Sequence, residues 1–146
     1  IDSRAPDLRQ SLKALTGSRG VDVAYDPVGG SLTEAALRGM AWGGRLLVIG
    51  FASGTIPQPP LNLALLKGCD ILGVFYGAFM EREPQRNAAL LHQLLDWVAQ
   101  GRLQPAITQR LPLEQAALAL QQVAGRQALG KTVLLTPRGR AAEPKP

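Results

Sequence analysis

Apolar residues recur along the chain with two periods that follow each other in turn. Where they repeat every three or four positions, the pattern predicts helices, and we expect these over residues 6–15, 31–42, 61–67, 84–100 and 113–124. Short runs rich in β-branched residues lie between them and predict strands over residues 21–26, 45–49, 70–76, 106–111 and 131–135. Helices that alternate with strands are typical of an α/β fold with a parallel sheet.

Local signals indicate where some of these helices begin, end and pack. Ser31 followed by Glu34 has the spacing of a capping box, so we expect the second helix to begin at Ser31. The pair Gly43-Gly44 would end that helix, and Gly101 would end the fourth. The apolar stripes predicted to pack in the core are Leu32, Ala35, Ala36 and Met40 in the second helix, and Leu90, Leu91, Leu94, Leu95 and Val98 in the fourth.

Composition narrows the class of protein. The chain has 146 residues, 46% of them hydrophobic, and a net charge of +5, which suits a globular domain with a core. No apolar run approaches the roughly 20 residues that cross a bilayer, and the first residues do not resemble a signal peptide. Cys69 is the only cysteine, so a multi-cysteine zinc site is excluded. These features predict a cytoplasmic protein without membrane or metal.

The positive charge is partly concentrated in the last eleven residues. Residues 136–146 contain Arg138, Arg140 and Lys145 against Glu143 alone, together with three prolines, and we predict a disordered tail there. Nucleic-acid binding would favour a folded cationic face with aromatic residues among the cations. The few aromatic residues here lie in apolar runs instead, so we expect no nucleic-acid partner.

Glycines follow the predicted strands where a ligand would lie. The first strand runs into Pro27-Val-Gly-Gly30 and the second into Gly50. In open α/β sheets ligands bind beyond the carboxyl ends of the strands, and glycine lets backbone approach a ligand closely. The phosphate-binding pattern G-x-G-x-x-G is absent from the chain. The pattern predicts the second half of a doubly wound, Rossmann-like sheet without its phosphate loop.

Three longer stretches carry a family resemblance. They are Gly20-Val-Asp-Val-Ala-Tyr-Asp-Pro-Val-Gly-Gly30, Ala41-Trp-Gly-Gly-Arg-Leu-Leu-Val-Ile-Gly-Phe-Ala-Ser-Gly54 and Gly73-Val-Phe-Tyr-Gly-Ala78. Together they resemble the zeta-crystallin-like quinone oxidoreductases, a zinc-independent branch of the medium-chain dehydrogenase/reductase superfamily. The resemblance implies the carboxyl-terminal part of a longer protein. Residues 1–100 would be a partial dinucleotide-binding domain, and residues 101–135 the returning segment of a GroES-like substrate domain.

The resemblance also implies a set of cofactor contacts. NADPH is the expected cofactor, with NADH as an alternative, and no metal takes part. Backbone groups would reach the adenosine and ribose, then the nicotinamide ribose, then the carboxamide, and Lys131 matches a lysine that contacts the cofactor in related enoyl reductases. The implied cofactor-binding residues are Val28, Gly29, Gly30, Ile49, Gly50, Phe51, Ala52, Val74, Phe75, Tyr76 and Lys131.

The family activity would be hydride transfer to a quinone or an enone, in a homodimer joined through the edge strand 70–76. The pyrophosphate loop of the family would precede Ile1, so we expect the isolated chain to be inactive. No residue is assigned to catalysis. Tyr76 is expected to pack beside the nicotinamide or at the dimer edge rather than to donate a proton.

Several residues that could carry chemistry have simpler interpretations. His92 lies four residues before Asp96 and is expected to be a surface imidazole beside a carboxylate. Cys69 precedes a strand and is expected to be buried, and Asp26, before Pro27, is expected to stabilise the turn. Trp42 and Trp97 are expected to pack.

Three other functions stay open on the residues alone. The chain could be a non-catalytic dimerisation module, an enoyl thioester reductase of the same superfamily, or a basic nucleic-acid binder through its tail. The first two share the predicted fold, and the third depends on the cations of residues 136–146.

Overall fold

The computed structural model describes residues 7–142, which form two compact units that divide after Pro84. The long helix that starts at Pro84 groups with the second unit. The domain boundary at residue 100 stays a prediction. The predicted helix start at Pro6 lies outside the described residues.

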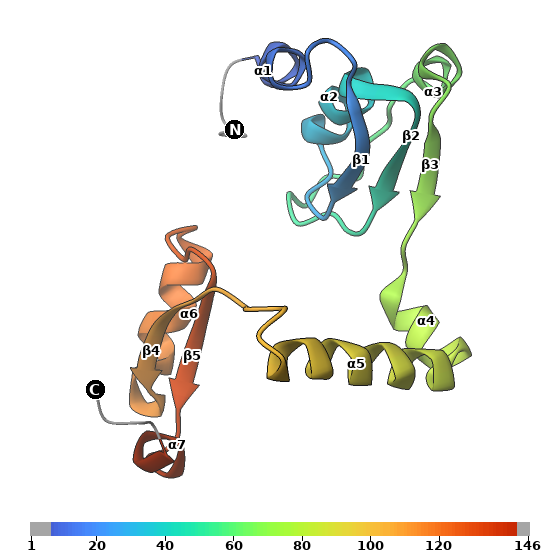
Figure 1. Cartoon of the computed structure of the whole chain (residues 1–146). Coiled ribbons are helices and arrows are strands. Elements are labelled where there is room, and N and C mark those ends of the chain that lie inside the picture. Colours follow the sequence, from blue (N-terminus) through green and yellow to red (C-terminus); the bar gives the residue numbers. More distant parts are fainter. Residues whose placement is uncertain (1–6, 143–146) are drawn as a thin grey trace. The chain divides into compact units, whose positions relative to one another are not determined.

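The first unit is built on a three-stranded parallel sheet (Figure 1). Its strands are β1 (Val21–Asp26), β2 (Met40–Val48) and β3 (Asp70–Gly73), in the order β1-β2-β3. The register pairs Tyr25 with Leu47 and Leu47 with Leu72. The predicted α/β class and the parallel pairing are therefore confirmed, and β3 lies at an edge of this sheet.

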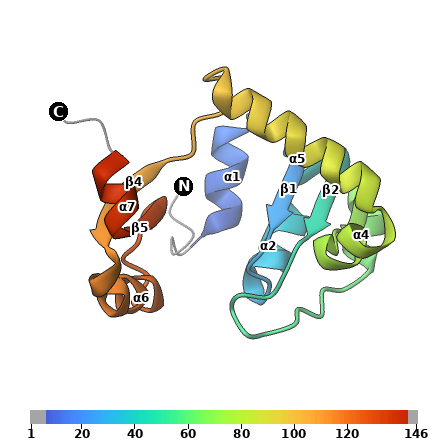
Figure 2. The same cartoon turned by 90° about the horizontal axis from the view of Figure 1, so that it is seen from below.

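Four helices belong to this unit, namely α1 (Leu8–Leu15), α2 (Ser31–Gly39), α3 (Asn62–Lys67) and α4 (Tyr76–Arg82). The core forms where α2 and α3 meet β2, from Leu37, Met40, Leu46, Leu63 and Cys69. Between β2 and α3 the chain follows an extended connection, residues 49–61, which can be traced in Figure 2. The predicted burial of Cys69 is confirmed.

The second helix begins at Ser31 as predicted, but its N-cap and its carboxyl end differ from the prediction. Gly30 occupies the N-cap with φ +62°, so Ser31 is already helical and caps nothing with its side chain. The helix ends at Gly39, and Gly43-Gly44 lie within β2. There the Gly43 N–H donates to the Gly68 carbonyl at 2.9 Å. The backbone at Gly43 is therefore bonded to a distant segment and does not continue the helix.

The buried face of α2 is also shifted from the predicted stripe. Leu37 is 0% exposed and Thr33 is buried, whereas Leu32, Ala35 and Ala36 are only partly buried. The predicted burial of Met40 is confirmed, and Ala36 packs against the core. The sequence pattern missed Thr33 because its side chain is polar.

The third strand is shorter than predicted. It ends at Gly73, and Tyr76 begins α4 instead of ending the strand. The Val74 N–H still donates to the Val48 carbonyl at 2.9 Å, but β2 itself ends at Val48. Beyond Val48, β2 offers β3 no further hydrogen-bonding partner, and the chain continues into α4.

The second unit holds the elements after Pro84. These are α5 (Pro84–Ala99), β4 (Ile107–Pro112), the 3₁₀ helix η1 (Leu113–Gln115), α6 (Ala116–Ala124), β5 (Lys131–Leu135) and α7 (Pro137–Ala142). Strands β4 and β5 form a parallel two-stranded sheet. The predicted helix over residues 84–100 and the predicted strands over 106–111 and 131–135 are confirmed to within a residue at each end. The tail predicted to be disordered forms α7 in its described part.

The apolar stripe of α5 is not part of a core. Leu90, Leu91, Leu94, Leu95 and Val98 are all exposed, contrary to the prediction. Trp42, also predicted to pack, is 82% exposed, although its ring lies against Gly68. Within residues 7–142 no helix is long and apolar enough to cross a membrane.

Replacing Leu37 by Ala should lower the free energy of unfolding by about 2–5 kcal/mol, because it opens a cavity between α2 and β2. The same change at the partly buried Leu32 should cost about 1 kcal/mol or less. Urea denaturation followed by circular dichroism measures both. Equal losses would contradict this description of the α2 face.

Candidate functional site

The carboxyl ends of the three parallel strands bring together most of the predicted cofactor-binding residues. The turn 27–30 follows β1, the loop 49–55 follows β2, and residues 74–76 follow β3. Backbone hydrogen bonds join the first two segments: Ala52 N donates to the Pro27 carbonyl at 3.1 Å, Ser53 N to the Val28 carbonyl at 2.9 Å, and Gly30 N to the Thr55 carbonyl at 3.1 Å. The first two segments therefore form one continuous surface beside the end of β3.

A buried carboxylate holds the turn after β1. Asp26 is 8% exposed, and its Oδ1 accepts hydrogen bonds from the N–H groups of Val28 and Gly29, both at 2.9 Å. The other oxygen, Oδ2, accepts from the Thr33 hydroxyl at 2.5 Å. This one side chain ties the last residue of β1 to the turn and to α2, as predicted for Asp26, and Thr33 is a partner that the sequence analysis missed.

Opposing influences act on the ionisation of Asp26. Burial by itself would raise the pKa of the carboxyl group, but the hydrogen bonds from Thr33, Gly29 and Val28 outweigh burial and lower the pKa below its ordinary value. The ionised form is therefore the one that the folded chain stabilises.

Two of the glycines at the site are required by the chain itself. Gly29 has φ +73°, and a Cβ there would lie 2.8 Å from Cδ1 of Phe51 and 3.1 Å from the Thr55 carbonyl oxygen. Gly30, at φ +62°, donates its N–H to that same Thr55 carbonyl at 3.1 Å. Both positions need glycine for the turn to meet the loop.

Gly50 is different, because nothing in the chain demands a glycine there. Its φ is not positive, and a Cβ would be 3.5 Å from the Pro27 carbonyl oxygen, an ordinary contact. The missing side chain leaves open backbone between the ends of β1 and β2, where a bound molecule could approach.

A cavity of about 410 Å³ opens next to this surface. Gly30, Ser31 and Glu34 line it from the start of α2, and Thr55 and Ile56 line it from the connection that follows β2. Its volume is within the range of sites for small organic ligands.

The segment after β3 presents apolar groups to solvent. Val74 and Tyr76 are exposed, and Phe75 is 79% exposed at the N-cap of α4. The Tyr76 ring lies 6.1 Å from that of Phe79, so Tyr76 packs within its own helix.

Lys131 is the one predicted cofactor contact that lies in the second unit, at the start of β5. Its N–H donates to the Ala106 carbonyl at 2.8 Å. Its part in the site stays a prediction.

The other residues considered for chemistry are either exposed or paired with a neighbouring side chain. Asp22 pairs with Arg19 at 2.5 Å. His92 is exposed on α5, and Trp97 stacks under the Arg102 guanidinium at 5.1 Å. Among residues 7–142 no group of three His, Cys, Asp or Glu side chains is placed to hold a metal ion.

Asp26→Asn should lower the free energy of unfolding at pH 7 by about 1.5–3 kcal/mol, because hydrogen bonds to an ionised acceptor are weakened. The folded pKa lies below the unfolded value of about 3.9. The stabilisation is therefore fully present above that value and is lost as the pH falls through the folded pKa.

The wild-type advantage over Asp26→Asn should thus be constant from pH 7 to about 5 and shrink below about 4. Urea denaturation at each pH measures it, with exposed Glu81→Gln as the control. An advantage that grew on acidification would contradict the assignment.

Comparison with known proteins adds to this geometry. The model of the family described as zinc-binding dehydrogenase matches residues 1–134. Quinone oxidoreductase-like protein 2 of Bos taurus is 37% identical over 127 residues, which cover 87% of this chain and 36% of that protein. A quinone oxidoreductase-like protein 2 homolog of Nematostella vectensis is 33% identical over 137 residues, 93% of this chain and 38% of that protein.

A solved structure agrees with the sequence matches. A mycobacterial protein in complex with NADPH aligns with a TM-score of 0.73 and 27% identity, over 87% of this chain and 38% of that one. The chain spans little more than a third of the length of these relatives. The chain belongs to the zinc-binding dehydrogenase family, within the medium-chain dehydrogenase/reductase superfamily.

Proposed function

We propose that the carboxyl ends of β1, β2 and β3 form one side of a dinucleotide crevice in an NADPH-dependent oxidoreductase that reduces a quinone or an enone. The observation that carries this proposal is the convergence of Gly30, Gly50 and Val74 at one end of a parallel sheet. Nucleotides bind at that end in open α/β sheets. Quinone oxidoreductase-like relatives and the NADPH-bound neighbour support the choice of cofactor and acceptor.

The chain fits a dinucleotide best at Gly50. No contact within the chain requires glycine there, and its bare backbone leaves room for a bound group to lie against it. In this proposal Val28, Gly29 and Gly30 line the ribose of the adenosine. Ile49, Gly50, Phe51 and Ala52 follow the nicotinamide ribose.

Residues Val74, Phe75 and Tyr76 would border the nicotinamide. Their exposed apolar side chains would exclude water from the reacting carbon. The bound dinucleotide supplies the hydride, and these residues orient it and keep the site dry. Lys131 stays a proposed cofactor contact on the family resemblance alone. No metal ion takes part in the proposed reaction.

The proposed oxidoreductase depends on more than these residues. The chain contains no G-x-G-x-x-G loop for the pyrophosphate, so the chain by itself is proposed to bind NADPH weakly and to give no turnover. NADH is the alternative cofactor.

Gly50→Ala tests the crevice without disturbing the fold. In ¹⁵N-labelled chain, NADPH should shift amides of residues 28–30, 49–52 and 74–76, and Gly50→Ala should weaken binding about tenfold or more. The free energy of unfolding should change by no more than about 0.5 kcal/mol, because a Cβ has room there.

Gly139→Ala, in α7, provides the matched control and should leave the NADPH titration unchanged. Shifts that cluster outside the three segments, or equal affinity for Gly50→Ala and the wild type, would contradict the crevice.

We further propose a homodimer through the edge strand β3, because Ile71 and Leu72 are exposed on it and unpaired edges invite association. Sedimentation velocity should show a dimer at micromolar concentration. A monomer would contradict this interface, whereas a dimer whose amides do not respond to NADPH would favour a dimerisation module over an oxidoreductase.

A further inference from the structure

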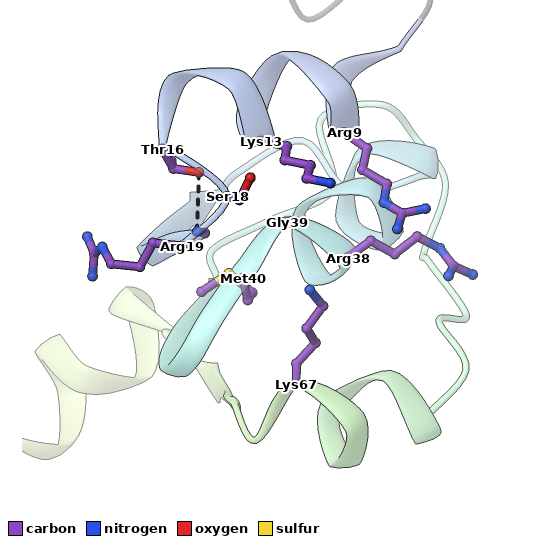
Figure 3. Close-up of a pocket in the computed structure, with 10 residues that line it drawn as sticks. Arg9, Lys13, Thr16, Ser18, Arg19, Arg38, Gly39, Met40 and Lys67 are labelled. Carbon is purple, nitrogen blue, oxygen red and sulfur yellow. Dashed lines mark hydrogen bonds between the residues drawn. The ribbon is translucent and has the colours of Figure 1, made fainter.

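A second cavity lies at the opposite end of the sheet and is lined by cations. Its volume is about 210 Å³, and five basic residues line it: Arg9, Lys13, Arg19, Arg38 and Lys67. No acidic residue is among the described residues that line it. Figure 3 shows Lys13 and Lys67 reaching toward a common space from α1 and α3, with Arg9 beside Lys13 on α1, whereas Arg38 and Arg19 extend away from it.

Backbone geometry builds the floor of this cavity. Gly20 has φ +95°, and a Cβ there would lie 2.6 Å from the Ala41 nitrogen, so the start of β1 packs directly on the start of β2. Thr16 fixes the approach to β1, because its hydroxyl donates to the Leu12 carbonyl at 2.9 Å and accepts from Gly20 N at 3.2 Å. The floor is therefore held in place by the sheet and not by the cations.

Two of the five cations already have carboxylate partners. Arg19 forms a two-pronged pair with Asp22 at 2.5 and 2.6 Å, and both are exposed. Arg38 donates from Nε and Nη2 to Glu34 at 2.9 and 2.6 Å.

The other three cations have no acidic partner among the described residues. No carboxylate of residues 7–142 lies within ion-pair distance of Arg9, Lys13 or Lys67. Within this part of the chain the cavity therefore keeps an excess of three positive charges.

Helix ends account for only part of this excess. Lys13, Arg38 and Lys67 lie in the last turns of α1, α2 and α3, where a cation stabilises the helix dipole. Each helix end carries about −0.5 charge at most, so three ends leave the cavity positive.

The helix dipole does not account for Arg9, because Arg9 lies in the first half of α1. It lies one turn before Lys13 on the same face of α1, and like charges at this spacing repel each other. The cost of that repulsion is offset when an anion lies between them.

The cavity is separate from the proposed dinucleotide crevice. Gly20, Met40 and Lys67 adjoin the amino ends of the three strands, and the crevice adjoins their carboxyl ends. Because a strand rises about 3.3 Å per residue, β1 separates the two by roughly 17 Å. The cavity is also smaller than the roughly 300–1,000 Å³ of sites for drug-sized ligands, and so suits a small anion.

We propose that this cavity binds a phosphate group, either free or as a small phosphomonoester, through Arg9, Lys13 and Lys67. Arg9 brings a planar guanidinium that can bond two phosphate oxygens, and the lysines add ammonium donors on two sides. Arg38 completes the positive wall while it stays paired with Glu34.

Titration of the ¹⁵N-labelled chain with inorganic phosphate, at ionic strength held constant with chloride, tests the proposal. Saturable shifts are expected at the amides of Thr16, Gly20 and Gly39, which line the cavity. Arg9→Gln and Lys13→Gln should each weaken binding about tenfold, because each removes a charge-assisted hydrogen bond. Glycerol phosphate in a parallel arm shows whether an esterified phosphate binds more tightly than the free ion.

Arg82→Gln, on α4, changes the net charge by the same amount and should leave the phosphate affinity unchanged. In phosphate-free buffer Arg9→Gln should raise the melting temperature, because it relieves the repulsion with Lys13. Either of two results would overturn the site: no saturable response of these amides to phosphate, or equal weakening of phosphate binding by all three variants. These amides report the cavity directly, so neither result bears on NADPH binding.

Discussion

The carboxylate of Asp26 is the interaction on which the candidate site depends. A single buried side chain terminates β1, supports the turn through the amides of Val28 and Gly29, and anchors α2 through Thr33. The turn is thereby held where Gly29 meets Phe51 and Gly30 meets Thr55. If the carboxylate were lost, the turn would keep only its backbone hydrogen bonds to the loop after β2, and the amides of Val28 and Gly29 would lose their acceptor.

Because the strands are parallel, the two ends of the sheet differ in chemistry. The carboxyl ends gather glycines and exposed apolar side chains, among them Phe75. The amino ends gather the last turns of α1, α2 and α3 with their cations. The same connections that bring loops together for a dinucleotide therefore bring helix carboxyl termini together on the other side.

Sequence reasoning predicted the parts of this fold that follow from local pattern. The parallel α/β alternation, β5 at Lys131–Leu135 and the role of Asp26 follow from apolar runs and turn chemistry. The face of α2 did not, because Thr33 is buried by its bond to Asp26, a partner seven residues away. The end of β3 depends on where β2 ends, and the exposure of the α5 stripe depends on what packs against it. The cationic cavity was missed for the same reason, since its five residues are spread over nearly sixty positions of sequence.

The glycines show how packing and ligand contact can be told apart within one site. At Gly29 a side chain would collide with Phe51, so that glycine is explained by the fold and carries no information about a ligand. At Gly50 a side chain would fit, so the fold does not explain the glycine. A substitution there should lower the affinity for a bound molecule and leave the free energy of unfolding unchanged. It therefore separates binding from stability. The functional argument is therefore strongest at the residue that contributes least to holding the structure together.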